Sequence, residues 1–360
     1  MRTKQTLAIC VCAIFCLFST LSYASATDYE VYVLVHEGTN MDNIRYMLND
    51  LGAVDGVCVM VNLYDNTTEA MDEAINRLES YLSTLQNYKV VVQAIYCFPY
   101  GYMSHHWQFE LSSFSEEFYT AWYSKLNACF ANYSNVKLFV GFNEAYFSFE
   151  SKNDALTLMQ REYTTWKSIS SIPFSCEITF PFYLWHNYFN VTDPNFEADV
   201  LPVWQNYSDY IGLNLIAYRY SPFYGIDPEG YNQTKEAVLT ALYYGELYDK
   251  PVHIDEVLCW YPQDFQYVAE NLMENPHITA VYKLWDWNNS TESIYALYNI
   301  DPENGEITKV TPTWEVFQQV INPPIQTPIP ETKWYENKLT FGIAILCIFL
   351  AIYFFIRLSK

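Results

Sequence analysis

Basic residues are scarce in this sequence of 360 residues. Nineteen Lys and Arg stand against 41 Asp and Glu, which leaves a formal net charge of −22 at pH 7 and a pI near 4.5. Nucleic acids and other anionic polymers bind to basic surfaces. The scarcity therefore argues against such partners and favours a neutral or cationic ligand.

Glycine-rich turns that bind phosphate are also lacking. The first apolar run is followed by His36-Glu37-Gly38-Thr39, which is not such a turn, and no P-loop pattern occurs. A nucleotide cofactor is therefore not expected, and no other cofactor is indicated.

Cysteine spacing predicts no metal centre. Outside the two apolar terminal segments, five cysteines remain, and none has the CxxC spacing of a zinc site: Cys58, Cys97, Cys129, Cys176 and Cys259. Their odd number predicts at least one free thiol. The adjacent pair His105 and His106 is not expected to bind a metal either, because such a pair alone seldom does.

Both ends of the chain carry apolar segments. Arg2 and Lys4 precede an apolar run at 7–21, and Ala24-Ser25-Ala26 has the small residues of a cleavage site, so residues 1–26 are predicted to be a signal peptide. Residues 339–356 carry no charge and would form a helix of about 27 Å, which is long enough to cross a bilayer. We therefore expect a single-pass protein of the cell membrane with an extracellular N-terminal domain.

The segments between these ends fit an exported chain. Residues 27–321 are expected to form one ectodomain, the proline-rich residues 322–337 a stalk, and residues 338–360 the transmembrane helix with a short cytoplasmic tail. Sequons for N-glycosylation occur at Asn66, Asn132, Asn190, Asn206, Asn232, Asn288 and Asn289.

Eight short apolar runs alternate with longer stretches across the ectodomain. The runs occupy residues 30–36, 56–63, 89–97, 136–142, 174–180, 210–217, 251–258 and 279–285. Helical signals follow at 40–42, 66–69, 154–168, 230–247, 264–273 and 313–320. This alternation predicts an α/β fold, a (β/α)8 TIM barrel, whose buried parallel strands read as continuous apolar runs. An open doubly wound sheet is the competing architecture.

Two carboxylates stand at strand ends where a barrel places its active site. The fourth run is followed by Asn143-Glu144, and the seventh contains Asp255-Glu256. A pair of Glu residues on nearly opposite strands suits glycoside hydrolysis, in which one carboxylate attacks the anomeric carbon and the other protonates the leaving oxygen. If the register of the seventh strand differs by one residue, Asp255 replaces Glu256 as the candidate nucleophile.

These motifs resemble the large clan of retaining glycosidases built on the β/α barrel, which includes cellulase-like and mannanase-like enzymes. The resemblance implies that Glu144 is the acid/base, that Glu256 is the nucleophile and that Asn143 binds the sugar 2-hydroxyl. It also implies substrate contacts for the aromatic residues after the sixth strand and at the eighth: Tyr218, Tyr220, Trp285 and Trp287.

The sequence departs from the clan's pattern in several places. Tyr218 stands where many members have His, and the second strand ends Asn62-Leu63-Tyr64 without the usual arginine, so that Arg219 is the arginine nearest a strand end. Ala145 and Val257 replace the clan's Pro and Gly.

Three functions therefore remain open. The first is a membrane-anchored glycoside hydrolase that acts on a neutral β-linked glycan. The second is a catalytically inactive barrel that binds carbohydrate through its aromatic residues, of which the chain has 33 Tyr, 23 Phe and 10 Trp. The third is a structural cell-surface protein in which acidity and glycans provide solubility.

Overall fold

The computed structural model describes residues 30–36, 38–98, 109–142, 152–180, 196–217, 220–221, 225–226, 228–259, 278–289 and 296–321. The chain divides after Ile321, and every described residue belongs to the first unit. The predicted signal peptide, stalk and transmembrane segment lie outside this set. Among the described residues, no helix is both long and apolar enough to span a membrane.

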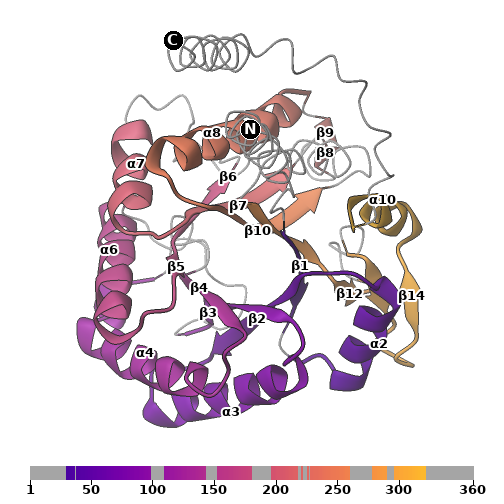
Figure 1. Cartoon of the computed structure of the whole chain (residues 1–360), viewed down its shortest axis with the longest axis horizontal. Helices are drawn as coiled ribbons and strands as arrows, with labels where there is room; N and C mark the ends of the chain where they lie inside the picture. Colours follow the sequence, from indigo (N-terminus) through magenta and orange to yellow (C-terminus); the bar gives the residue numbers. More distant parts are fainter. Residues whose placement is uncertain are drawn as a thin grey trace, which may run out of the picture. The chain divides into compact units, whose positions relative to one another are not determined.

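Parallel strands form the centre of the molecule (Figure 1). The nine strands of this sheet are β1 (Glu30–Val35), β2 (Gly56–Leu63), β3 (Lys89–Tyr96), β4 (Val136–Phe142), β5 (Phe174–Ser175), β6 (Glu177–Phe180), β7 (Ile211–Ala217), β10 (Val252–Cys259) and β11 (Ile278–Lys283). All eight predicted apolar runs are strands. The fifth run is divided at Cys176 into β5 and β6.

The pairing of the strands closes the sheet. β1 pairs in parallel with both β2 and β11, so the first strand lies beside the last. β5 pairs with β4 and β6 pairs with β7, so the divided fifth strand joins the two ends of the strand order. This closure confirms the predicted parallel barrel. It excludes the open doubly wound sheet, in which the first strand does not pair with the last.

Helices surround the strands (Figure 1). They are α2 (Met41–Leu51), α3 (Thr68–Thr84), η1 (Leu111–Ser113), α4 (Glu116–Phe130), α6 (Lys152–Ile169), α7 (Phe196–Asn206), α8 (Pro228–Tyr248) and α10 (Thr311–Ile321). Three begin at side-chain caps, where Asn40, Thr67 and Ser115 accept backbone N–H bonds. The helix predicted at 264–273 lies outside the described part of the chain.

Two small sheets complete the described structure. β8 (Tyr220–Ser221) and β9 (Gly225–Ile226) form an antiparallel pair. β12 (Trp285–Trp287), β13 (Tyr298–Ile300) and β14 (Ile307–Lys309) form a separate three-stranded sheet. The eighth barrel strand therefore ends at Lys283, and the two tryptophans belong to the strand that follows it.

The barrel has an outer and an inner core. Side chains such as Val33, Val59 and Val92 pack outward against the helices. Alternate residues form a second apolar cluster inside the barrel: Tyr32, Leu34, Cys58, Met60, Val91, Ile95, Cys97, Leu138, Val140 and Val281. By the same alternation, several buried polar residues face inward as well: Asn62, Gln93, Ser175, Glu177, Asn214, His253, Asp255 and Lys283. The barrel interior is therefore partly polar.

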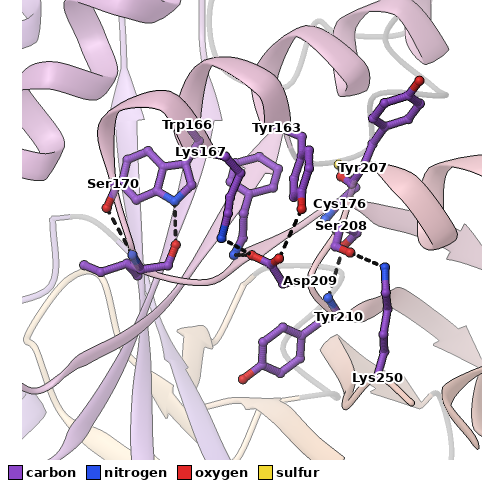
Figure 2. Close-up of polar contacts among 12 residues, drawn as sticks. Tyr163, Trp166, Lys167, Ser170, Cys176, Tyr207, Ser208, Asp209, Tyr210 and Lys250 are labelled. Atoms are coloured by element: carbon purple, nitrogen blue, oxygen red, sulfur yellow. Dashed lines mark hydrogen bonds and ion pairs between the residues drawn. The ribbon is translucent and has the colours of Figure 1, made fainter. Parts of the chain in front are cut away.

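A polar network holds the start of the divided strand (Figure 2). Asp209 accepts hydrogen bonds from the Phe174 N–H at 2.8 Å and from the Tyr163 hydroxyl at 3.2 Å, and it pairs with Lys167 at 3.1 Å. Because Phe174 opens β5, these contacts fix where the fifth strand enters the barrel.

Ser208 and Lys250 extend this network. The Ser208 hydroxyl accepts a hydrogen bond from the Cys176 N–H at 3.0 Å, at the break between β5 and β6 (Figure 2). Lys250 Nζ donates to the carbonyl oxygens of Trp204, Gln205 and Ser208 at 2.6 to 2.8 Å. These carbonyls lie at the C-terminal end of α7, where the helix itself offers them no donors. The contacts of Ser208 and Asp209 thus connect the fifth strand with the end of α7.

Candidate active site

The described part of the structure includes only some of the predicted site residues. β4 ends at Phe142, so Asn143 and Glu144 follow its last residue in sequence but lie outside the described residues. Tyr218 and Arg219 also lie outside them, as do His105, His106 and Trp107. For these residues the roles given above stay predictions.

Glu256 lies in β10, where the pairing with β7 changes register. Ile254 pairs with Leu213 and Val257 with Leu215, so Asp255 and Glu256 together oppose the single residue Asn214. This is a β-bulge, a feature common at barrel rims and beside active sites because it redirects a side chain. β10 continues to Cys259, so Glu256 is not the last residue of the strand.

Asp255, the alternative nucleophile, belongs to the barrel interior. Its side chain is completely buried, and its Oδ2 accepts a hydrogen bond from the side-chain amide of Gln93 on β3. His253, two residues earlier and also completely buried, has its Nε2 3.8 Å from Asp255 Oδ1. A carboxylate sealed among core residues cannot reach a polysaccharide, so this geometry favours Glu256 as the candidate nucleophile.

The two predicted tryptophans lie together after the eighth strand. Their rings pack edge to face with centroids 4.9 Å apart and an interplanar angle of 84°. Trp285 is buried and its indole N–H has no hydrogen-bond acceptor among the described residues, whereas Trp287 is 43% exposed. An exposed ring beside a buried one is suited to stacking on a sugar. Tyr220, a further predicted substrate-contacting residue with described backbone, lies in β8.

Polar side chains lie beside these tryptophans, and one of them, Lys283, was not singled out from the sequence. Lys283 at the end of β11 is buried and its Nζ is 2.7 Å from Asp286 Oδ2. His36, after β1, packs edge to face on Trp285 with centroids 6.3 Å apart. Burial, with a further contribution from the Lys283 charge, lowers the His36 pKa to about 3, so this imidazole is neutral at physiological pH. For Lys283, the only sequence signal was its position at the end of a strand.

A second missed residue stands behind the fourth strand. Glu162 on α6 is completely buried and accepts hydrogen bonds from the Tyr123 hydroxyl at 2.7 Å and from the Phe142 N–H at 3.1 Å. Burial raises its pKa to about 7 in spite of these donors. Since Phe142 is the residue before Asn143, Glu162 fixes the backbone from which the candidate acid/base segment starts. Its place in an amphipathic helix gave no signal of this role.

The end of the second strand shows how this chain differs from the clan's pattern. Arg77 from α3 donates to the Asn62 carbonyl oxygen at 2.9 Å, and its guanidinium lies 5.4 Å from the centre of the exposed Tyr64 ring. An arginine is therefore present near this strand end, but it comes from the following helix, which lies outside the barrel.

Known structures share this fold. Fpglu1 from Fervidobacterium pennivoraus aligns with a TM-score of 0.54 at 14% identity, over 80% of this chain and 84% of its own. A hyperthermophilic β-glucosidase from Pyrococcus furiosus aligns at 0.53 and 13% identity over 84% and 87%, and a family 1 β-glucosidase from Thermotoga maritima at 0.51 and 10% over 78% and 86%. No family model and no curated protein sequence matches the chain. At these identities the likeness shows the fold.

Proposed function

We propose that this protein is a membrane-anchored glycoside hydrolase that cleaves a neutral β-linked glycan outside the cell with retention of configuration. Glu256 is its nucleophile and Glu144 its acid/base. The observation that carries the proposal is the bulge of β10 at Asp255–Glu256 within a closed parallel barrel. Asp255 is buried in the core, and bulges of this kind redirect side chains next to active sites, which supports Glu256 as the nucleophile.

The chemistry needs two steps. In the first, the Glu256 carboxylate attacks the anomeric carbon while the Glu144 carboxylic acid gives its proton to the departing glycosidic oxygen. In the second, the Glu144 carboxylate removes a proton from water, which displaces Glu256 from the same carbon. The two inversions together retain the configuration, and both carboxyl groups return to their initial protonation states.

The surroundings support a neutral sugar as substrate. The net charge of −22 disfavours anionic polymers, and Trp287 offers an exposed ring after the eighth strand. Five predicted glycosylation sites support export because their asparagines are exposed: Asn66, Asn132, Asn206, Asn288 and Asn289.

The experiment that tests the proposal is chemical rescue of two nucleophile and acid/base variants. Wild type, Glu256→Ala and Glu144→Ala are assayed on aryl β-glycosides with and without azide. We expect each variant to lose about 10³-fold or more in kcat/KM. Azide should then yield an α-glycosyl azide with Glu256→Ala, because it replaces the nucleophile, and a β-glycosyl azide with Glu144→Ala.

A matched control is Glu69→Gln, which removes an exposed carboxyl in the first turn of α3 and should keep full activity. If wild type cleaves a substrate but Glu256→Ala retains its rate, the nucleophile is assigned to the wrong residue. If both variants lose activity and neither forms a glycosyl azide, the two-carboxylate retaining mechanism is wrong.

A binding protein without turnover is the second candidate. It is favoured by the end of the second strand, where Asn62 and the following Tyr64 present an amide and a phenol in place of the clan's arginine. In that case the full chain would bind a β-linked glycan in a glycan array and cleave none. Binding would then survive Glu144→Gln and Glu256→Gln and be lost in Trp287→Ala.

A further inference from the structure

Three ionisable side chains meet inside the barrel, on strands β6 and β10. His253 Nε2 lies 3.5 Å from Glu177 Oε1 and 3.8 Å from Asp255 Oδ1. One ligand atom from each residue lies within 4.8 Å of those of the other two. All three side chains are buried, with 0 to 1% of their surface exposed. This cluster, Glu177–His253–Asp255, contains neither of the two proposed catalytic glutamates and neither tryptophan of the pair.

The histidine in the cluster is chemically exceptional. Neither ring nitrogen of His253 has a hydrogen-bond partner among the described residues, and Asp255 Oδ1 has none there either. A buried imidazole normally donates from one nitrogen and accepts at the other, because an unmet polar atom in the core is costly. Here His253 Nε2 and one oxygen of each carboxylate lie close together instead, at 3.5 Å and 3.8 Å.

A glycine on β7 lies between the strands that carry Glu177 and His253. Gly212 on β7 is in register with both Glu177 and His253, so it separates the two strands that carry them. A Cβ at Gly212 would lie 2.2 Å from the Cys176 carbonyl oxygen and 2.5 Å from Ser175 Oγ. A residue with a side chain would clash with these atoms, so the close approach of β6 and β7 beside Glu177 and His253 requires glycine at this position.

We propose that this cluster binds one divalent transition-metal ion through His253 Nε2, Glu177 Oε1 and Asp255 Oδ1. A zinc ion with ligands at about 2.0–2.2 Å and tetrahedral angles keeps neighbouring ligand atoms about 3.4 Å apart, close to the two separations found here. The charge of a divalent ion balances two carboxylates that would otherwise repel one another in the core. An imidazole ligand favours zinc or iron over calcium and magnesium, which prefer oxygen alone.

Gln93 would support such an ion from the second coordination sphere. Its amide Nε2 donates to Asp255 Oδ2, which leaves Oδ1 directed toward His253. Hydrogen bonds of this kind orient a ligating carboxylate. The ion would also tie β6 to β10 immediately before Glu256, and so would fix the bulge. The role is structural, since all the protein ligands lie below the surface.

The test uses the purified full chain. Protein stripped with a chelator is titrated with Co²⁺ and with Zn²⁺, and its metal content and melting temperature are measured. We expect one ion per chain, an intense visible absorption from Co²⁺ in a low-coordinate site, and a melting temperature that falls on stripping and recovers with metal. These readouts are independent of glycosidase activity, so the proposed function can fail while this site stands.

Two variants and a control assign the ligands. Asp255→Asn and His253→Gln should each weaken metal binding at least 10-fold and lower the intensity of the Co²⁺ spectrum. Asp72→Asn removes a carboxylate that pairs with Lys125 on the helix surface and should bind metal like the wild type. If a variant fails to fold, the change of the wild-type melting temperature with chelator and metal still tests whether the protein binds an ion.

Two results would overturn the proposal. The first is wild-type protein that binds none of Zn²⁺, Co²⁺ and Mn²⁺ stoichiometrically and melts at the same temperature with or without them. Hydrogen bonds between His253 and the two acidic side chains would then stabilise the cluster without a metal ion. The second is stoichiometric binding that persists unchanged in folded Asp255→Asn and His253→Gln, because the ion would then lie elsewhere.

Discussion

Glu162 shows how one residue can connect the outer core with the candidate site. Its carboxyl group lies between α4, α6 and the end of β4, where Tyr123 and Tyr96 direct their hydroxyls toward it at 2.7 and 3.5 Å. Burial is the largest influence on its pKa, which rises from 4.5 to about 7. The Phe142 N–H bond keeps the acid beside the segment that leads to Glu144.

The raised pKa of Glu162 predicts a pH dependence of stability. Between about pH 4.5 and 7 the folded chain holds a proton that the unfolded chain releases, so the free energy of unfolding falls as the pH rises and levels off above pH 7. Its contribution across that window is at most about 3 kcal/mol. Glu162→Gln cannot titrate, so urea unfolding at a series of pH values should show this part of the slope missing.

The exposed variant Glu69→Gln is the control for that experiment and should keep the wild-type slope. If Glu162→Gln and the wild type lose stability in parallel from pH 4.5 to 7, the Glu162 carboxyl does not titrate in this range.

Individual residues also show how much of the candidate site could be predicted from the sequence. Counting apolar runs predicts Glu144 after the fourth strand and Glu256 in the seventh, but it does not decide between Asp255 and Glu256. Strand periodicity has a repeat of two residues, and a bulge breaks that repeat without a sequence signal. Glu162 and Lys283 were missed for another reason: a charged residue is ordinarily placed at the surface, and their burial depends on partners distant in sequence.

At the scale of elements, strands were easier to predict than helices. Both faces of each barrel strand are buried, so the strands read as apolar runs that differ from polar surroundings. Two helices gave no clear signal. α4 is rich in aromatic residues on most of its faces, including Phe118, Tyr119 and Trp122, and α7 contains Pro202. Aromatic and proline residues lower helix propensity, and tertiary packing overrides it here.

The end of α7 predicts the effect of removing one lysine. Lys250 Nζ donates to three carbonyl oxygens at 204, 205 and 208, and partial burial lowers its pKa. Lys250→Met keeps the aliphatic chain but leaves these acceptors unmet. We expect the free energy of unfolding to fall by about 1–3 kcal/mol, measured by urea denaturation.

Lys137→Met is the matched control, because Lys137 is exposed on β4 and donates to one carbonyl, that of Ser134. Its stability should stay within about 0.5 kcal/mol of the wild type. Equal losses in the two variants would mean that Lys250 contributes through its charge or stem and not through the three hydrogen bonds.

At the scale of the whole molecule, the closed barrel explains why an active site is expected at one end of it. All strands of the large sheet are parallel, so their C-terminal ends, and the residues that follow β1 and β11, come to the same rim. The sequence predicted this architecture because its run count equals the number of barrel strands. It did not predict the polar interior, since polar residues inside apolar runs carry no signal of which face they occupy.

The proposed membrane anchor, residues 339–356, predicts where the protein is found in a cell. The full chain should partition with membranes and resist extraction by carbonate, because 18 uncharged residues are long enough to span a bilayer. A chain that ends after residue 337 should be secreted into the medium, with its barrel intact. Ile348→Arg, near the middle of the segment, should weaken insertion by about 3 kcal/mol and divide the protein between both fractions. A truncated chain that still sediments with membranes would show that other residues hold the protein there, and the predicted anchor would then be wrong.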